Sequence, residues 1–569
     1  MSTGVTLKRR HAGVEGEWPE TVPPLLRRIY QARGATDLAQ ARPKLAQLLP
    51  PTMLGLDAAA ALLSDAIDRD RHIVVVGDFD CDGATACATA VRGLRMLGAR
   101  RVSHAVPNRQ VHGYGLSAAL VGELATLAPD LLVTVDHGIA CHAGVEAARA
   151  RGWQVLVTDH HLPGGTLPAA DVIVNPNQPG CGFPGKALAG VGVVFYVLLA
   201  LRRHLRESGK LALPEPDLGR LLDLVAVGTV ADLVPLDANN RALVAAGLRR
   251  LRAGAGNPGL TALAAVSGRE LHRLTAADIG FAVAPRLNAA GRMEDMAIGI
   301  ECLLSDDPAH ARELATALDR INRERRAVQQ AMTDQAEAVL STLQLSGPPP
   351  VAACLFDASW HAGVVGLVAS RMKDRLHRPV IAFAPAAPDS AELRGSARSI
   401  PGLHIRDVLA MVEARHPGLM GRFGGHAMAA GLSLARERLE AFEQAFLACV
   451  HERVDPAMLQ AELLSDGELS PAELCHASAL ALRDGGPWGQ GFPEPQFDGE
   501  FEVLGWRQVG DRHVRFELAA GTARVPAIHF GGWDGREPPS RVRIAYRLEP
   551  DDYRGGEAIQ LVVVHREAP

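Results

Sequence analysis

Short, uninterrupted apolar runs alternate with amphipathic stretches in the first third of the chain. The runs are rich in β-branched side chains, which is typical of strands buried on both faces of a parallel sheet. They cover residues 73–76, 131–135, 155–158 and 172–174, and helical patterns lie between them, for example at 84–97 and 116–127. This alternation predicts a doubly wound α/β domain, in which ligands bind at the carboxyl ends of the strands.

A long stretch without glycine separates this region from a second α/β pattern. Residues 308–343 place apolar side chains at helical spacing and are followed by Ser346-Gly347-Pro348-Pro349-Pro350, so they predict a long connecting helix with a stop after it. The second pattern predicts a strand at 351–355, a helix at 363–376, a strand at 379–384 and a glycine-rich segment that ends in Gly424-Gly425-His426.

Short alternating strands replace helices after about residue 456. Glycine and aspartate separate the runs at 497–503, 513–518, 527–530, 542–548 and 559–564. This spacing predicts a small β-barrel of the OB type, although an open sandwich also fits it. We expect most of the aromatic residues here to be core, and the Trp488-Gly489-Gln490 segment to pack against the upstream domain.

Length and composition indicate several folded domains. The chain has 569 residues, of which 47% are hydrophobic and 22% charged, as in ordinary globular proteins too long for one core. A formal net charge of −5 argues against a protein that coats nucleic acid through bulk charge alone, so a polyanion site must be local. The expected parts are an N-terminal extension (1–49), the first α/β domain (50–306), the connecting helix (307–345), the second α/β domain (346–455) and the barrel (456–569).

The cysteines and the apolar runs bear on where the protein works. The eight cysteines are scattered and form no C-x-x-C pair, which argues against a disulfide scaffold and a structural zinc site. The N-terminus has no apolar stretch behind its charges, and the longest apolar run, 191–201, is too short to span a bilayer. We therefore expect a cytosolic protein without a membrane partner.

Three carboxylates follow the first predicted strand in the segment Gly77-Asp78-Phe79-Asp80-Cys81-Asp82-Gly83. On an extended chain, side chains two residues apart project to the same side, so these charges would converge. Like charges destabilise such a cluster unless a cation neutralises them. Taken alone, the motif also fits a solvated acidic turn in which one aspartate caps the next helix.

Acidic and imidazole side chains also follow the next two predicted strands. These are Asp136-His137-Gly138 and Asp159-His160-His161, and Asp232 is a further candidate after another apolar run. A mixed carboxylate and imidazole set suits Mn²⁺ or Mg²⁺. The number of carboxylates, with Asp136 central, indicates two ions about 3.5–4 Å apart, as in enzymes that hydrolyse phosphate esters or anhydrides.

A series of blocks then carries a resemblance to a known family. The blocks are 77–83, 107–116, 135–138, 159–161, 174–176, 228–232, 286–292, 394–399 and 424–431. In this order they resemble the DHH phosphoesterases, named for the Asp159-His160-His161 triplet, and within them the bacterial RecJ family of single-strand-specific 5′→3′ DNA exonucleases. The resemblance extends over nearly the whole chain and identifies the second α/β domain as a DHH-associated domain.

The resemblance implies roles for individual residues. Two ions, Mn²⁺ or Mg²⁺, would be held by Asp78, Asp80, Asp82, Asp136, His160 and Asp232, with Asp136 bridging them. Asp136, His161 and His426 would be catalytic. The 5′-terminal phosphate and the strand backbone would be bound by Arg109, Tyr114, Arg286, Asn288, Arg292, Arg394, Ser396, Arg398, Gly424, Gly425 and His426.

We therefore interpret the chain as a 5′→3′ exonuclease that releases 5′-mononucleotides from single-stranded DNA. The resemblance implies a role in DNA recombination and repair in the bacterial cytoplasm, with single-strand-binding protein and a RecQ-type helicase as partners. One alternative is a DHH phosphodiesterase of short oligonucleotides or cyclic dinucleotides, and another is a pyrophosphatase. Such phosphodiesterases generally lack the long connecting helix and the terminal barrel, and a pyrophosphatase would not need the barrel. A non-catalytic replication scaffold is the alternative of another class, but such a chain would have lost its metal ligands.

Overall fold

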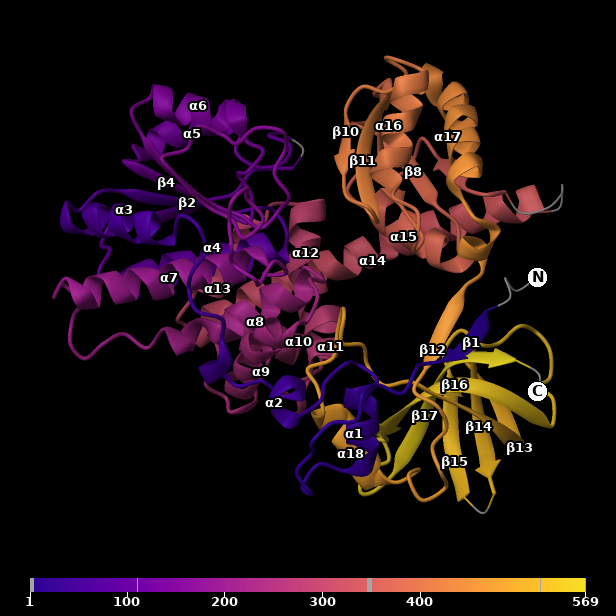
Figure 1. Ribbon diagram of the computed structural model, residues 1–569. Helices are drawn as coiled ribbons and strands as arrows, with labels where there is room; N and C mark the ends of the chain where they lie inside the picture. The colour runs from indigo at the N-terminus through magenta and orange to yellow at the C-terminus, as the bar shows by residue number, and fades with distance from the viewer. Residues whose placement is uncertain (1–4, 110, 345–349, 522, 568–569) are drawn as a thin grey trace. The chain divides into compact units, whose positions relative to one another are not determined.

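A parallel sheet forms the centre of the N-terminal region in the computed structural model, which describes residues 5–109, 111–344, 350–521 and 523–567 (Figure 1). The sheet has five strands in the order β3-β2-β4-β5-β6. The strands are β2 (Ile73–Val76), β3 (Val102–Ala105), β4 (Leu131–Val135), β5 (Gln154–Thr158) and β6 (Val172–Val174). Only β3 was not predicted, because Ser103 and His104 interrupt its apolar run at the sheet edge.

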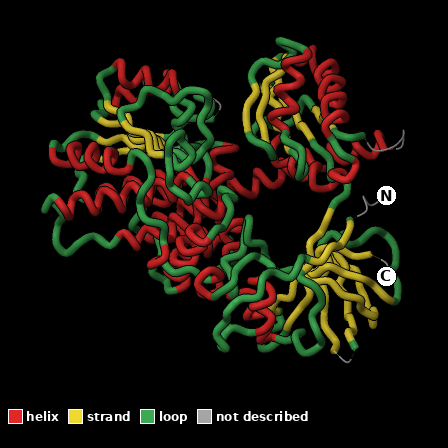
Figure 2. Tube along the Cα trace, in the orientation of Figure 1, coloured by secondary structure: helices red, strands yellow, loops and turns green. Residues whose placement is uncertain are grey.

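Helices cover both faces of this sheet, so the doubly wound prediction is confirmed (Figures 1 and 2). Ile73 and Val75 of β2 point into one apolar cluster, while Val74 and Val76 point into the other, as expected for alternating side chains on a strand. The first cluster includes α3 (Leu56–Asp68), α4 (Cys81–Met96) and α7 (Gly190–Glu207), and the second includes α5 (Ala118–Leu124) and α6 (His142–Ala150).

The strand order has a topological switch point between β2 and β4. The chain crosses from β2 outward to β3 and then returns to the other side of β2 to form β4. At such a switch point the connections after the two central strands diverge to opposite faces and leave room at the carboxyl ends. Asp78 and Asp136 lie at these two strand ends.

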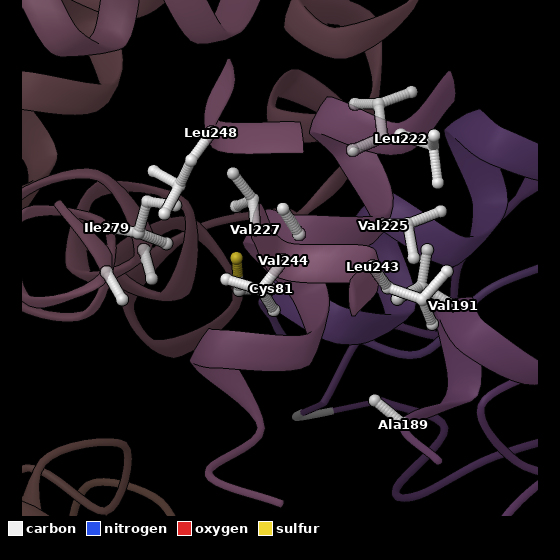
Figure 3. Close-up of a cluster of buried hydrophobic side chains, with 14 of the residues drawn as sticks. Cys81, Ala189, Val191, Leu222, Val225, Val227, Leu243, Val244, Leu248 and Ile279 are labelled. Carbon is white, nitrogen blue, oxygen red and sulfur yellow. The ribbon is translucent and has the colours of Figure 1, made fainter. Parts of the chain in front are cut away.

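A second layer of helices continues from α7 and adjoins the carboxyl ends of the strands. The apolar residues of α8 are buried around its whole circumference, as expected for a core helix. Cys81 lies among its side chains and those of α9, including Val227 and Val244 (Figure 3). The layer contains α8 (Leu222–Ala231), α9 (Ala238–Arg252), α10 (Pro258–Val266), the π-helical turn η5 (Ile279–Val283), α12 (Ala284–Met293) and α13 (Ala297–Leu304).

The predicted connecting helix is present as α14 (Pro308–Gln344). Its apolar residues Leu318 and Ile321 are fully buried, consistent with the helical spacing in the sequence. Most of the predicted stop, residues 345–349, lies outside the described residues. Contacts divide the chain within this helix into two compact units: residues 9–321 with the chain from 465 onward, and residues 322–464 with the chain up to residue 8.

The second α/β pattern forms a mixed sheet with the strand order β10-β11-β9-β8-β7. Only β7 and β8 pair in parallel. The elements are β7 (Ala353–Phe356), α15 (Val365–Leu376), β8 (Val380–Pro385), β9 (Glu392–Arg398), α16 (Ile405–Arg415), β10 (Phe423–Gly425), β11 (Ala429–Ala435) and α17 (Leu439–Arg453). The strands β9 to β11 were not predicted, because glycines such as Gly395 and Gly431 weaken their apolar alternation.

The C-terminal strands close into a barrel, which confirms the OB-like prediction and excludes the open sandwich. The barrel order is β13-β14-β15-β17-β16. The strands are β13 (Phe497–Val509), β14 (His513–Ala520), β15 (Ala523–His529), β16 (Arg541–Pro550) and β17 (Ile559–Glu567). Phe497, Phe501 and Phe516 are buried in its core as expected.

Within its unit, the barrel is joined to the N-terminal α/β region through the chain before β13. Leu236 N donates a hydrogen bond to Gln490 O at 2.6 Å, and the Arg241 guanidinium lies 3.9 Å from the ring centre of Phe492. The predicted packing of the segment around Trp488 is therefore confirmed. The N-terminal helix α1 (Pro24–Gln31) contributes Tyr30, whose hydroxyl donates to Gly485 O at 2.7 Å.

A short sheet pairs β1 (Thr6–Arg9) with β12 (Glu462–Ser465). No helix among the described residues is long and apolar enough to cross a membrane.

Candidate active site

The acidic turn after β2 differs from the extended arrangement predicted for it. Helix α4 already begins at Cys81, so Asp82 lies in the first helical turn and only Asp78 and Asp80 precede it. Asp80 caps the helix, because its Oδ1 accepts a hydrogen bond from Gly83 N at 2.9 Å. The carboxylates nevertheless converge: oxygens of Asp78, Asp80 and Asp136 lie within 4.8 Å of one another.

Asp82 is held by the N-terminus of α7. Its Oδ2 accepts from Gly190 N at 2.6 Å and its Oδ1 from Val191 N at 3.0 Å. Burial, followed by the repulsion of Asp80, raises the pKa of Asp82 to about 7, although these two backbone bonds oppose the shift. Gly190 is required for the close approach, because a Cβ there would lie 2.5 Å from Asp136 Oδ1. The α7 terminus therefore donates to Asp82 and, through Gly190, leaves room for Asp136.

Asp136 occupies a backbone conformation that is unusual for an aspartate. Its φ is +65° directly after β4, and its side chain is only 2% exposed. The left-handed conformation costs of order 1–3 kcal/mol and persists where the surrounding structure imposes it, often at functional sites. Asp136 Oδ1 lies 3.1 Å from His160 Nε2, and Asp232 Oδ2 lies 3.5 Å from the same nitrogen.

The carboxylates of this site are poorly compensated without a cation. Burial, then the charge of a neighbouring carboxylate, raises the pKa of Asp78, Asp136 and Asp232 well above the ordinary value. Within the described chain, the buried Asp78 Oδ1 meets no hydrogen-bond donor. A divalent ion that prefers oxygen ligands would neutralise the repelling carboxylates and coordinate the buried oxygen that has no donor. The residues, with their neighbouring imidazole, therefore fit Mn²⁺ or Mg²⁺.

The candidate ligands form overlapping sets. Asp136 belongs to two of the three groups whose ligand atoms converge, and so does His160. The groups are Asp78 with Asp80 and Asp136, Asp136 with His160 and His161, and Asp82 with His160 and Asp232. The structure thus brings together every residue predicted as a metal ligand, with Asp136 shared between sets.

Asp159 was absent from the predicted site residues but organises the histidines. Its Oδ1 accepts from His160 N at 2.7 Å and from His161 N at 3.0 Å, and lies 2.7 Å from His161 Nδ1, while Oδ2 accepts from Ile139 N at 2.9 Å. Although burial disfavours the charge of both partners, this ion pair lowers the pKa of Asp159 and raises that of His161 to about 9. Its position in the triplet was the sequence signal for this role.

His137 was also missed as a supporting residue. It is fully buried, and its Nε2 lies 3.0 Å from Val76 O at the end of the neighbouring strand β2. Burial lowers its pKa to about 4, so the ring is neutral near pH 7. His137 therefore ties together the ends of β2 and β4, from which the carboxylates project.

Two predicted substrate-binding residues lie over the acidic turn. Phe79 contacts both of them: the Arg109 guanidinium lies 5.0 Å from its ring centre, and the Tyr114 ring meets it edge to face at 6.1 Å. The Tyr114 ring also lies 6.1 Å from that of His161, and its side chain remains 51% exposed. An aromatic and a cation thus border the carboxylates on the loop after β3.

The three predicted residues on α12 have different surroundings. Arg286 forms an ion pair with Asp319 of α14 at 2.8 Å. Asn288 Oδ1 accepts a hydrogen bond from Cys81 N at 2.9 Å. Arg292 is partly buried in the last turn of the helix. These bonds link α12 to α4 and α14.

The remaining predicted residues belong to the second unit and gather on one sheet. Arg394, Ser396 and Arg398 alternate along one side of β9, and Arg398 donates to Ser396 Oγ at 2.9 Å. Strand β11 pairs with both β9 and β10, so it separates this group from the exposed Gly424-Gly425-His426 turn. Gly425 has a φ of +140°, which only glycine adopts readily.

Three family models match the chain. The N-terminal domain of the DHH family matches residues 72–229, the DHHA1 domain matches 349–452, and the RecJ OB domain matches 465–565. The three matches fall on the parallel sheet, the mixed sheet and the barrel, respectively.

Full-length relatives are similar to the chain from end to end. It is 49% identical over 571 residues to a single-stranded-DNA-specific exonuclease RecJ of Dickeya dadantii, with 99% of each chain covered. Identity to the protein of the same name from Escherichia coli is 47% over 573 residues, again with 99% of each covered.

Solved structures of RecJ from Thermus thermophilus share the fold. The complex with Mn²⁺ has a TM-score of 0.80 at 33% identity, covering 96% of this chain and 76% of that chain. The complex with Mg²⁺ has a TM-score of 0.75 at 30% identity, with 96% and 75% covered.

The raised carboxyl pKa values predict that metal binding depends on pH. A carboxyl group must lose its proton to bind an ion, and the pKa of Asp82 is about 7. We expect the Mn²⁺ dissociation constant to fall as the pH rises through 7, with protons released on binding at pH 6.5. Calorimetry in buffers of different ionisation enthalpy measures both effects. An affinity that is constant from pH 6 to pH 8 contradicts this prediction.

Proposed function

The chain belongs to the RecJ family of single-stranded-DNA-specific exonucleases, and we propose that its overlapping ligand sets hold two divalent ions at which single-stranded DNA is hydrolysed. It is a metal-dependent exodeoxyribonuclease, with Mn²⁺ or Mg²⁺ as cofactor. The observation that carries the two-ion proposal is the sharing of Asp136 between two convergent ligand groups, one with Asp78 and Asp80 and one with His160 and His161. Such ions supply a Lewis acid, activate water near neutral pH and stabilise the attacking and leaving oxygens of an in-line displacement.

The protein residues orient the reacting groups. Asp136 would bridge the two ions, and the remaining ligands would be Asp78, Asp80, Asp82, His160 and Asp232, which all belong to the overlapping groups around it. His161 carries a positive charge near neutral pH because Asp159 raises its pKa to about 9. We assign it to a non-bridging oxygen of the scissile phosphate, to which a protonated imidazole makes a strong charge-assisted bond.

Recognition of the strand end is assigned to the arginine groups. Arg109 over the acidic turn and Arg394, Ser396 and Arg398 on β9 offer guanidinium and hydroxyl donors suited to phosphate. The Gly424-Gly425 pair allows close approach of a phosphate to the backbone before His426. Of the three predicted residues on α12, Arg292 completes this set, whereas Arg286 pairs with Asp319 and Asn288 Oδ1 accepts a hydrogen bond from Cys81 N. A 5′-terminal phosphate bound in this way gives 5′→3′ polarity and mononucleotide products.

A groove on the barrel is the proposed site for the rest of the strand. It has a volume of about 520 Å³ and is lined by Trp506, Arg507, Arg515, Phe516, Arg524 and Arg554, among others. Arg507 and Arg515 lie directly opposite each other on β13 and β14, and like charges in such a pair are destabilising. None of the ion pairs among the described residues includes either of them. Phosphates of a single strand would neutralise both.

An aromatic surface adjoins the charged groove. The Trp506 ring stacks on that of Trp533 with centres 5.5 Å apart. Bases stack on aromatic side chains without sequence preference, which suits a nuclease that must degrade any sequence. The groove therefore combines the two contacts by which proteins bind single strands.

The cellular setting is proposed from the family resemblance. We place the enzyme in DNA recombination and repair in the bacterial cytoplasm, with single-strand-binding protein and a RecQ-type helicase as partners. The long helix α14 and the closed barrel favour this setting over the short-substrate phosphodiesterase and pyrophosphatase alternatives. The intact ligand sets argue against a non-catalytic scaffold.

Asp136→Ala should abolish hydrolysis while the fold is retained. A carboxylate shared by two ions has no substitute, so the rate should fall at least ~10³-fold, equivalent to several kcal/mol of lost charge stabilisation. Release of end label from single-stranded DNA in saturating Mn²⁺ measures the effect, and circular dichroism monitors the fold. If the variant retains a tenth of the wild-type rate, the two-ion assignment is wrong.

Digestion should depend on the strand and on its end. A 5′-phosphorylated single strand should be degraded from that end, whereas a blunt duplex and a 3′ overhang should resist. Arg398→Ala should narrow the preference for a 5′ phosphate over a 5′ hydroxyl, because a charge-assisted bond is lost. The assay compares single strands labelled at the 5′ end with single strands labelled at the 3′ end, and so shows from which end digestion begins. Digestion from the 3′ end, or ready cleavage of closed circles, is incompatible with the proposal.

The barrel groove should govern capture of long strands and not cleavage of short ones. Arg515→Ala should weaken binding of a long single strand and make the slope of log K against log salt shallower by about 0.7, the value for one phosphate contact. Arg541→Ala is the matched control, because Arg541 is an exposed barrel arginine that pairs with Glu500 outside the groove. Fluorescence anisotropy at several salt concentrations measures the slope. Equal slopes for the two variants would show that the groove does not bind the strand.

A further inference from the structure

Helix α12 reaches the backbone of the acidic turn through one side chain. Asn288 Oδ1 accepts the hydrogen bond of Cys81 N at 2.9 Å. Cys81 is the first residue of α4, and the first N–H groups of a helix have no partner within it. Asp80 caps Gly83 N of the same turn. The turn is therefore fixed at one donor by its own aspartate and at another by a residue far away in the sequence.

A glycine lets α12 approach this turn closely. A Cβ at Gly291 would lie 1.8 Å from the carbonyl oxygen of Phe79, the residue between Asp78 and Asp80. Any other residue at this position would push the helix away from the turn. Helix α12 also packs on α4 and α8, which carry Asp82 in the first turn and Asp232 after the last.

The position of α12 is itself fixed from the other side. Arg286 pairs with Asp319 of α14 at 2.8 Å, and both side chains are largely buried, with 12% and 16% exposed. Arg286 also donates to Ala282 O, one turn earlier, at 2.6 Å. An ion pair of low exposure is weakly screened and directional, so it holds the helix that presents Asn288.

We propose that Asn288 is a positioning residue for the metal-binding carboxylates. It acts through the Cys81 backbone, which sets the directions of Asp80 and Asp82, and it touches neither ion nor strand. This role replaces the strand contact expected from the resemblance, because the side-chain oxygen is directed at the turn. The inference rests on the proposed metal site.

The test measures Mn²⁺ affinity by electron paramagnetic resonance in the full-length protein. Asn288→Ala should raise the Mn²⁺ dissociation constant about 10–100-fold, as loss of residues that orient metal ligands does. Binding of a single strand without metal should stay unchanged. At saturating Mn²⁺, kcat should recover most of its wild-type value, with KM for the strand unaltered.

Asn239→Ala is the matched control. Asn239 is a buried asparagine in the same unit, and its Oδ1 likewise accepts a backbone hydrogen bond, from Leu49 N at 3.0 Å, as well as one from the Tyr196 hydroxyl, away from the acidic turn. Its removal should leave Mn²⁺ affinity within twofold of wild type. Gly291→Ala provides a second variant that removes no polar group yet displaces α12, and it should also weaken Mn²⁺ binding. Melting curves accompany all three variants.

The outcomes distinguish a failure of the Asn288 proposal from a failure of the proposed metal site. If Asn288→Ala binds Mn²⁺ like the wild type and loses affinity for the strand, Asn288 is a substrate contact and the proposal is wrong. If Asn239→Ala loses as much Mn²⁺ affinity as Asn288→Ala, the effect is general destabilisation and the proposal is also wrong. If the wild-type protein binds no Mn²⁺, the proposed two-ion function fails first.

Discussion

Mutual repulsion among buried carboxylates is the constraint on which the rest of this structure depends. Asp78, Asp82 and Asp136 are each at most 3% exposed, and their pKa values are raised by burial and then by the charge of a neighbouring carboxylate, Asp80 for the first two and Asp82 for the third. A fold gains nothing from such a cluster unless a cation occupies it, because uncompensated buried charge is strongly destabilising. Phosphodiester hydrolysis by divalent ions requires this concentration of negative charge, so the fold maintains it at a cost in stability.

Backbone and supporting side chains maintain the cluster from several directions. The α7 N-terminus donates to Asp82, Asp159 anchors the two histidines, and His137 connects the ends of β2 and β4. Most of these contacts use backbone N–H groups or buried hydrogen bonds, which hold ligands rigidly without adding charge. Glycines complete the arrangement where helices approach the carboxylates too closely for a side chain, as Gly190 does beside Asp136.

Hydrolysis and strand binding are assigned to different parts of the protein. In our proposal, hydrolysis takes place at one buried site at the switch point of the parallel sheet, where a few residues must be held accurately. Capture of a polymer of any sequence needs only repeated phosphate and base contacts, which we assign to the arginines and stacked tryptophans of the barrel groove. A protein with a net charge of −5 can bind a polyanion in this way, because its cations are locally concentrated.

The sequence alone determined the types of most elements and pointed to the candidate metal ligands, because apolar periodicity and the order of the motifs can be read directly along the chain. It predicted the buried strands, α14, the barrel and the convergence of Asp80, Asp136 and His160. Tertiary structure decided the start of α4 at Cys81, the weak strands β3 and β9 to β11, and the inward bond of Asn288. It also decided that Arg286 pairs with Asp319 and that Asp159 serves as an anchor. These features depend on which groups, distant in the sequence, come together in the folded chain. A polar side chain can face solvent, substrate or a neighbouring helix, and the local sequence pattern is the same in each case.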